Sequence, residues 1–341
     1  MSRTAFLDVG IGEARGVVLL DGRPERVIIE RDGEAACQRL GARSVTRVRR
    51  VDSNLGIAFL AMPEGPDAIA PAGRRVEGQA IEVEVASESR PDKGAAVTPI
   101  APAEGEPRLT KAAPALIERL KAWSGSGPLG GDGAREAADE AEEAALATEH
   151  ALPGGGRISI EPTRALVAVD VDIADRKGGD ARQLAKRTNL LAVTETARLL
   201  RLKGLSGLVV IDLVGKGHDG TALSAAARVA FAADEPGVSI GPISRFGLFE
   251  LSIPHRSRPV AEVLLDERGE LSALTVALRL VRALEREGRA DPGARLLARC
   301  SPDVAQAFAP YMSALTERLG ARVEIRPDPA FNRSRFEVAT R

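Results

Sequence analysis

Three aspartates occupy positions in this sequence that could support metal chemistry. Asp170 and Asp172 end the apolar segment RALVAVDVD, and Asp212 follows Leu-Val-Val-Ile in the segment GLVVIDLV. Both segments are predicted to be β-strands. Alternate residues of a strand point to opposite faces, so Asp170 and Asp172 share one face while the intervening valine takes the other. Asp212 then lies near the C-terminal end of its strand.

A helix predicted from Asp180 to Lys203 connects the two strands and makes them a βαβ unit. Such units have a right-handed crossover and parallel strands, which would bring Asp170 and Asp212 to the same edge of the sheet. Neighbouring strands are about 4.8 Å apart, so carboxylates at matching heights can share an ion. Mg²⁺ is commonly held by one or two carboxylates with substrate phosphate, and Mn²⁺ or Ca²⁺ fits the same geometry. The alternative is that these aspartates only cap a helix or anchor a loop.

Composition excludes several classes of protein. The 341 residues leave room for two or three domains, and the hydrophobic content of 44% and charged content of 28% are ordinary for globular chains. Cys37 and Cys300 are the only cysteines, which argues against a disulfide framework and against a cysteine-built zinc site. No apolar run has the length of a membrane span, and the first residues lack a signal-peptide core, so the expected location is the cytoplasm.

The net charge is −1, but the charges are segregated along the chain. Arginines gather between 43 and 50, a second basic tract runs from 182 to 203, and acidic residues concentrate between 136 and 143. Segregation of this kind can give a neutral protein a positive face for nucleic acid. The alternative is that each tract is a solvated helix face.

Hydrophobic periodicity and turn residues divide the chain into five parts. Short strands with polar turns predict a strand-rich N-terminal segment and then a small closed barrel, for which the OB type is the commonest. An Ala-, Gly- and Glu-rich stretch follows. Its sequence SGSGPLGGDG (124–133) is predicted from composition to be a flexible linker. Strand–helix–strand patterns then predict an α/β domain and a last α+β unit. The predicted boundaries are 1–43, 44–100, 101–151 (a linker with short helices), 152–265 and 266–341.

Three ordered segments resemble the catalytic core of the ribonuclease E/G family. They are GGGRISIEPTRALVAVDVD, RTNLLAVTETARLLRLKGLSGLVVIDLV and ISRFGLFELSIPHR. The resemblance implies a Mg²⁺-dependent endoribonuclease acting on single-stranded RNA, with Asp170 and Asp212 as metal ligands. The family asparagine beside the first aspartate corresponds to Asp172 here, which adds a negative charge and would orient a ligand or water.

The resemblance also extends to the other parts of the chain. It implies RNase H-like N-terminal strands, an S1-type OB-fold barrel, a DNase I-like α/β catalytic domain and a small terminal domain. Phe59 matches a family aromatic that contacts RNA, and Lys93 matches a lysine of the closing barrel loop; the alternative for Phe59 is a barrel-core residue. Arg245, in the Ser-Arg-Phe-Gly segment, and Arg256 are further candidates for holding the RNA backbone.

Two parts of the family pattern have no counterpart. Only a short segment stands where a 5′-monophosphate sensor is expected, so cleavage should be independent of the 5′ end. The segment RSRPVAEVLLDERGELSA contains no cysteine, so no zinc is expected and a zinc-linked tetramer is disfavoured relative to a monomer or homodimer. The main rival hypothesis is a non-catalytic RNA-binding protein derived from such an enzyme, and a third is a ribosome-associated factor.

Overall fold

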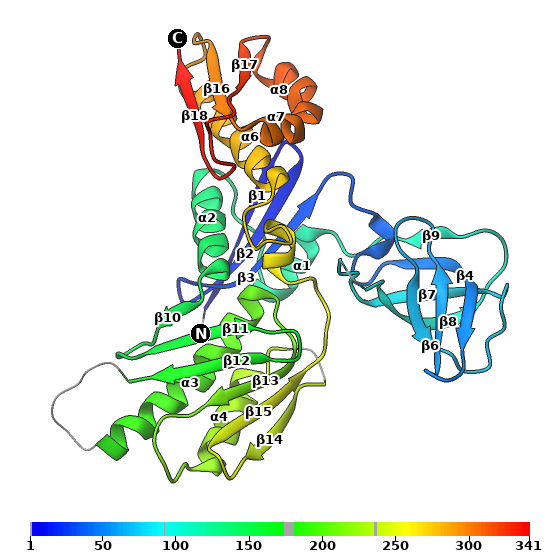
Figure 1. Ribbon diagram of the computed structural model, residues 1–341, viewed down its shortest axis with the longest axis vertical. Helices are drawn as coiled ribbons and strands as arrows, with labels where there is room; N and C mark the ends of the chain where they lie inside the picture. Colours follow the sequence, from blue (N-terminus) through cyan, green and yellow to red (C-terminus); the bar gives the residue numbers. More distant parts are fainter. Residues whose placement is uncertain (1, 92, 174–180, 235–236) are drawn as a thin grey trace.

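The computed structural model describes residues 2–91, 93–173, 181–234 and 237–341, and its described part is a mixed α/β chain with four sheets (Figure 1). The α/β and α+β multidomain class predicted from the sequence is confirmed at this level. The helix predicted from Asp180 is found as α3 (Ala181–Lys203), and Asp180 itself lies outside the described residues.

The N-terminal sheet is an antiparallel meander of β1 (Arg3–Gly10), β2 (Glu13–Leu20) and β3 (Arg23–Arg31). Helix α1 (Leu116–Ser124) packs on one face through a core that includes Val18 and Leu120. Helix α2 (Asp132–Leu146) packs on the other face, where Val17 belongs to the core that also holds Ala138. The period-2 alternation of Val17 and Val18 therefore places a helix on each side of this sheet.

The segment between the barrel and the α/β domain is more ordered than its composition suggests. We predicted a flexible sequence at 124–133, but Leu129 pairs with the edge of β1: its N–H donates to Ala5 O and its carbonyl accepts from Leu7 N, both at 2.8 Å. The alanine-rich composition of α2 likewise gave no sign that this helix is packed. Its small alanine side chains let this acidic helix approach the sheet closely. The composition of such a segment indicates that one face is exposed to solvent, but it does not indicate which residues are buried on the other face.

The barrel follows 3₁₀ helix η1 (Ala36–Gln38). Its strands are β4 (Arg43–Asp52), β5 (Ile57–Ala61), β6 (Ala68–Pro71), β7 (Ala80–Ser87) and β8 (Ala96–Pro102), and β9 (Arg108–Lys111) pairs with the outside of β4. The pairings β4–β5, β5–β6, β6–β8, β8–β7 and β7–β4 close a ring, as predicted. Gly94 lets β8 approach β6, since a Cβ at this position would lie 1.7 Å from Asp67 O.

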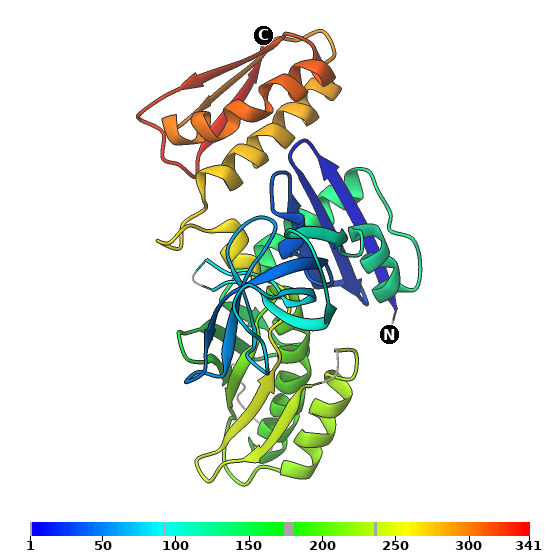
Figure 2. The same cartoon turned by 90° about the vertical axis from the view of Figure 1, so that its right-hand side faces the viewer.

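The α/β sheet has the order β10-β11-β12-β13-β15-β14. Its strands are β10 (Glu149–Ala151), β11 (Arg157–Pro162), β12 (Val167–Asp172), β13 (Gly207–Asp212), β14 (Ser239–Ile243) and β15 (Leu248–Ile253). Helices α3 and α4 (Gly220–Ala230) share one core with the apolar face of these strands, and Figure 2 shows them on one side of the sheet. The opposite face is open, and Leu208 near its centre is 45% exposed.

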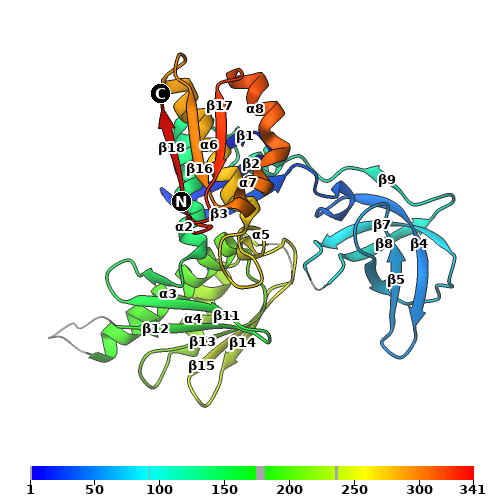
Figure 3. The same cartoon turned by 45° about the horizontal axis from the view of Figure 1, so that its top comes forward.

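The C-terminal unit follows α5 (Val260–Leu264) and lies beside the N-terminal sheet (Figure 3). It contains α6 (Ala273–Ala290), β16 (Leu296–Cys300), α7 (Pro302–Phe308), η2 (Ala309–Tyr311), α8 (Met312–Leu319), β17 (Val323–Pro327) and β18 (Phe336–Thr340). Helices α7 and α8 are separated by η2 at Pro310, which has no N–H to donate. Among the described helices, none combines the length and hydropathy of a membrane span.

Candidate active site

The two predicted metal ligands lie side by side on the open face of the α/β sheet. Strands β12 and β13 are parallel, and Asp170 is the direct partner of Asp212 in their register. The parallel pairing follows from the crossover through α3, whose apolar side chains pack on the buried residues of both strands. Val169 and Ile211 point into this core and are at most 2% exposed, whereas both aspartates are exposed. The predicted convergence of these two residues at one edge of the sheet is therefore what the backbone shows.

The donor set at this edge consists of carboxylates on neighbouring strands. In the part of the chain that the structure describes, no group of three or more His, Cys, Asp or Glu side chains is arranged to hold a metal. A cation here would take two carboxylate oxygens from Asp170 and Asp212 and the rest of its ligands from water or substrate. This fits Mg²⁺, which keeps several waters and uses few protein carboxylates. It does not fit a structural zinc site, which requires four protein ligands.

Asp172 lies on the same face as Asp170, but it has a cationic partner of its own. Its Oδ2 accepts a hydrogen bond from Arg157 Nη2 at 3.2 Å, and Arg157 is the direct partner of Asp172 across β11 and β12. Arg157 also lies 3.6 Å from Glu149. The arginine offsets the negative charge that Asp172 adds to this edge. The predicted role of Asp172 in orienting a ligand or water stays a prediction.

Asn189 is a structural member of this site that the sequence analysis missed. This α3 residue is 2% exposed, and its amide makes two hydrogen bonds with Val214, accepting from the backbone N–H at 3.0 Å and donating to the carbonyl at 2.9 Å. The pair of bonds fixes the chain two residues beyond Asp212. Asn189 Nδ2 also lies 3.4 Å from His218 Nδ1. The signal available in the sequence was a polar Asn inside an apolar helix stripe, since a buried amide needs partners.

The loop from Gly215 to Asp219 lies between β13 and α4. Asp219 caps α4 by accepting a hydrogen bond from Ala222 N at 3.1 Å, and it forms an ion pair with Lys186 at 3.0 Å. The Ala222 N–H and the Lys186 ammonium lower the pKa of Asp219 below its ordinary value. This aspartate is therefore a helix cap. It shows the alternative role that the sequence left open for the strand-end aspartates.

The four predicted RNA contacts do not form one cluster. Phe59 projects from the outer surface of the barrel, because its neighbours Ala58 and Leu60 are the residues that point inward. It therefore does not belong to the barrel core, and Arg50 stacks on its ring at 4.4 Å from the centroid. Lys93 is exposed in the hairpin between β7 and β8, where its backbone pairs with Arg90.

The two predicted arginines of the α/β domain lie at opposite ends of β15. Arg245 belongs to the turn before β15, near the aspartates, since Leu248 is the register partner of Asp212. It stacks on Phe246, whose side chain is 74% exposed. Arg256 follows the other end of β15 and faces the barrel, where its carbonyl accepts from Glu88 N at 2.8 Å. The geometry therefore brings Arg245 toward the aspartate edge and places Arg256 away from it.

Comparison with known proteins matches this chain to one family. Residues 107–257 match the sequence profile of the Ribonuclease E/G family. Ribonuclease E of Haemophilus influenzae is 38% identical over 152 residues, which cover 44% of this chain and 16% of that protein. Ribonuclease E of Escherichia coli is 41% identical over 123 residues, covering 35% of this chain and 12% of that protein.

A longer match, at lower identity, reaches Ribonuclease G of Salmonella typhimurium, which is 28% identical over 242 residues. That match covers 66% of this chain and 48% of the relative, so the chain spans less than half the length of each of these three proteins. The matched segment 107–257 contains the parallel strand pair, Asp170 and Asp212. The comparisons support membership of the ribonuclease E/G family through this segment, which is less than half of the chain.

Proposed function

We propose that this protein is a metal-dependent endoribonuclease that hydrolyses single-stranded RNA during RNA processing or decay. The names of its relatives support a role of the endoribonuclease class. The observation that carries the finer proposal is the direct register of Asp170 and Asp212 on an open sheet face. Asp172 and Glu250 are exposed on the same face, so phosphate groups would be repelled there unless a cation intervened.

In this proposal Asp170 and Asp212 hold Mg²⁺, and Mn²⁺ would serve in its place. A bound divalent ion lowers the pKa of a coordinated water and stabilises negative charge developing on a phosphodiester. The side chains around the site hold the metal ligands and the RNA in position. Asn189 fixes the residues beyond Asp212, Arg157 orients the Asp172 carboxylate, and Arg245 offers a cation for the RNA backbone close to the aspartate edge. Cleavage would leave 5′-phosphate and 3′-hydroxyl ends.

We assign the closed barrel to the S1-type OB class, the N-terminal strands to an RNase H-like unit and the α/β domain to a DNase I-like unit. The strand order of the barrel ring supports the first assignment, because β6 and β8 pair in parallel while the other neighbours in the ring are antiparallel. Phe59, Lys93 and Arg256 would then guide RNA along the barrel toward the α/β domain. Stacking on an aromatic ring gives affinity that tolerates many base sequences.

We also propose that cleavage is independent of the 5′ end, and the short connection between the barrel and α1 supports this. Residues 103–115 contain only the short strand β9 among their described elements. A connection of this length is too short to hold a further folded domain between these two elements. The absence of cysteine in the segment before α6 supports a monomer or homodimer without zinc. We place the protein in the cytoplasm, with single-stranded RNA as its partner.

The rival function is RNA binding without cleavage, and a metal titration distinguishes the two. We expect purified protein to cut a fluorescent single-stranded RNA in Mg²⁺, to stop after EDTA, and to resume when Mg²⁺ or Mn²⁺ is restored. RNA bound equally with and without metal, but never cut, would favour the non-catalytic relative. Weak binding to oligomers together with tight association with large ribonucleoprotein particles would favour the ribosome-associated factor.

Phe59→Ala should weaken binding of a single-stranded RNA by roughly tenfold, because one base–aromatic stack contributes about 1–3 kcal/mol. The ring lies outside the barrel core, so thermal stability should change little. Fluorescence anisotropy with a labelled oligomer measures the affinity. Val76→Ala is the matched control, since Val76 is an apolar surface residue of the barrel at 64% exposure. Equal affinities for Phe59→Ala and the wild-type protein would exclude Phe59 from the RNA contact.

A further inference from the structure

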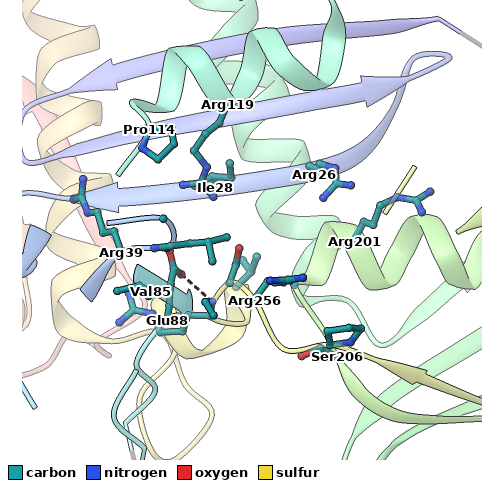
Figure 4. Close-up of a pocket in the computed structure, with 18 of the residues that line it drawn as sticks. Arg26, Ile28, Arg39, Val85, Glu88, Pro114, Arg119, Arg201, Ser206 and Arg256 are labelled. Atoms are coloured by element: carbon teal, nitrogen blue, oxygen red, sulfur yellow. Dashed lines mark hydrogen bonds between the residues drawn. The ribbon is translucent and has the colours of Figure 1, made fainter. Parts of the chain in front are cut away.

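A cavity of about 920 Å³ lies where the N-terminal sheet, the barrel and the α/β domain meet (Figure 4). Its lining includes Ile28 on β3, Val85 on β7 and Leu205 just before β13. The cavity is therefore at the start of β13, whereas Asp212 is at the end of that strand. Six strand residues separate these ends by roughly 17 Å, taking about 3.3 Å per residue. The cavity is distinct from the candidate active site.

Arginines from three elements and two loops line this cavity. The guanidinium-bearing residues are Arg26, Arg39, Arg119, Arg201, Arg256 and Arg258, most of which Figure 4 shows around the hollow. Acidic residues equal in number to the arginines also line it, and each already accepts a hydrogen bond or forms an ion pair; they are Glu30, Glu34, Glu84, Glu88, Glu118 and Asp234. Glu30 pairs with Arg39 at 3.0 Å and with Arg119 at 3.4 Å, and Glu34 pairs with Arg258 at 2.7 Å. The carboxylates therefore hold the arginines in place without satisfying all their donors.

Several buried donors at the cavity still lack a protein partner. Nε of Arg39 and Nε of Arg201 are buried and make no hydrogen bond, and the Arg201 side chain is only 7% exposed. Arg26 has one ion pair, at 3.3 Å to Asp234, and burial lowers its pKa below the ordinary value. A buried cation or donor without a full set of partners is costly, and an anion that enters the cavity relieves that cost.

The other walls suit an uncharged ring system. Ile28, Val85, Leu205 and Ile253 line the cavity as apolar side chains, and its volume is within the range usual for small-molecule sites. Trp123 also lines it, with Arg26 stacked at 4.7 Å and Arg119 at 5.6 Å from the ring centroid. These stacks fix both guanidinium planes. A cavity with fixed cations and apolar walls matches a phosphate joined to an aromatic, apolar-faced group.

We infer that this cavity binds a free mononucleotide, with the phosphate held by the arginines and the nucleoside against the apolar wall. The cavity shares Arg256 with the proposed RNA path, but no residue of the aspartate edge lines it, so the inference does not depend on the proposed cleavage. Its position at the junction of three units means that an occupant would also tie them together. Ligand binding should therefore raise the thermal unfolding midpoint of the whole chain.

The test uses the full-length chain with AMP, adenosine and inorganic phosphate as probes in isothermal titration calorimetry. AMP should bind at least about tenfold more tightly than adenosine, because only AMP offers charge-assisted hydrogen bonds to the arginines. Arg119→Gln should weaken AMP binding by about tenfold without affecting adenosine. Ala122→Trp should weaken AMP and adenosine alike, because it narrows the cavity at an exposed position of α1 while leaving the charges unchanged.

Arg228→Gln is the matched control, because Arg228 is an exposed arginine of α4 outside the cavity, and it should bind AMP as the wild-type protein does. Unfolding midpoints of all variants without ligand show whether each one is folded. The double variant Asp170→Asn, Asp212→Asn should keep full AMP affinity, which separates this inference from the nuclease proposal. No AMP binding at millimolar concentration, or equal binding of AMP and adenosine, would overturn it. Displacement of AMP by a 5′-phosphorylated RNA but not by a 5′-hydroxyl RNA would overturn the assignment to a free nucleotide.

Discussion

Asp170→Asn and Asp212→Asn should each reduce RNA cleavage by about a thousandfold, which corresponds to roughly 4 kcal/mol of lost transition-state stabilisation. An amide keeps the shape of the carboxylate but removes the charge that holds a divalent cation. Both side chains are exposed at the edge of the sheet, so neither change leaves a buried polar group unsatisfied. Single-turnover cleavage of a fluorescent RNA measures the rate, and anisotropy in EDTA measures binding, which should be largely retained.

Glu161→Gln is the matched control for these two variants. Glu161 is an exposed carboxylate on β11, and its register partner is Ala168, two residues before Asp170 on β12. The control therefore removes one negative charge from the same sheet face without touching the Asp170–Asp212 pair. Cleavage by Glu161→Gln should match the wild-type rate. Wild-type rates in both aspartate variants would reject the metal-ligand assignment, and an equal loss in all three variants would point to the overall charge of the face.

The aspartate edge could be predicted from the sequence because each step rests on local pattern or chain chirality. Alternation within RALVAVDVD fixes which residues are buried, and the helix between the strands requires a parallel pairing. Together these two rules bring Asp170 and Asp212 to the same edge of the sheet, and the observed register makes them direct partners. The cation partner of Asp172 was not predictable in this way. Arg157 reaches it through the antiparallel pairing of β11 with β12, and that register depends on the turn between them.

The parts that the sequence analysis missed depend on contacts between distant segments. Asn189 is far from Val214 in sequence, and only the packing of α3 under β13 brings its amide to that backbone. Strand alternation places Phe59 on the opposite face from Ala58 and Leu60. Which of these two faces points out of the barrel could be decided only from the residues that fill the barrel core. The pairing of Leu129 with β1 is a backbone interaction that leaves no mark on composition. Local sequence therefore predicted the strands, the helices and their buried faces better than it predicted contacts between residues far apart in the chain.

A buried ion network that joins three parts of the chain was likewise invisible in the sequence. Arg15 on β2 is 1% exposed and donates to Asp8 at 2.7 Å and to Glu142 of α2 at 2.8 Å. Arg282 of α6 donates to the same Asp8 oxygen at 3.2 Å and to Glu13 at 2.7 Å. These contacts connect the N-terminal sheet to α2 and to the C-terminal unit. Burial alone would raise the pKa values of Asp8 and Glu142, but the hydrogen bonds and charge of Arg15 outweigh burial and lower both.

Arg15→Met should lower the free energy of unfolding at pH 7 by about 3–5 kcal/mol, because it leaves buried carboxylates without their main partner. Methionine fills much of the same space, so lost packing contributes little. Urea unfolding followed by the fluorescence of Trp123, the single tryptophan, reports on the sheet that contains Arg15. Arg286→Met is the matched control, since the Arg286 side chain is 62% exposed and its ion pair with Glu287 is on the surface. The control should change the free energy of unfolding by less than about 1 kcal/mol.

The pH dependence of this variant separates lost charge pairing from a general loss of packing. In the wild-type protein Asp8 and Glu142 have lowered pKa values, so their stabilising contribution is complete above their ordinary pKa values, near 4, and is lost as the pH falls through the lowered ones. In Arg15→Met the carboxylates of Asp8 and Glu142, which keep only Arg282 and Arg279 as partners, should become protonated at higher pH than in the wild-type protein, which relieves their cost. The stability difference between the two proteins should therefore shrink as the pH is lowered from 7 toward 4. A difference that stays constant over this range would mean that packing, not charge, makes Arg15 important.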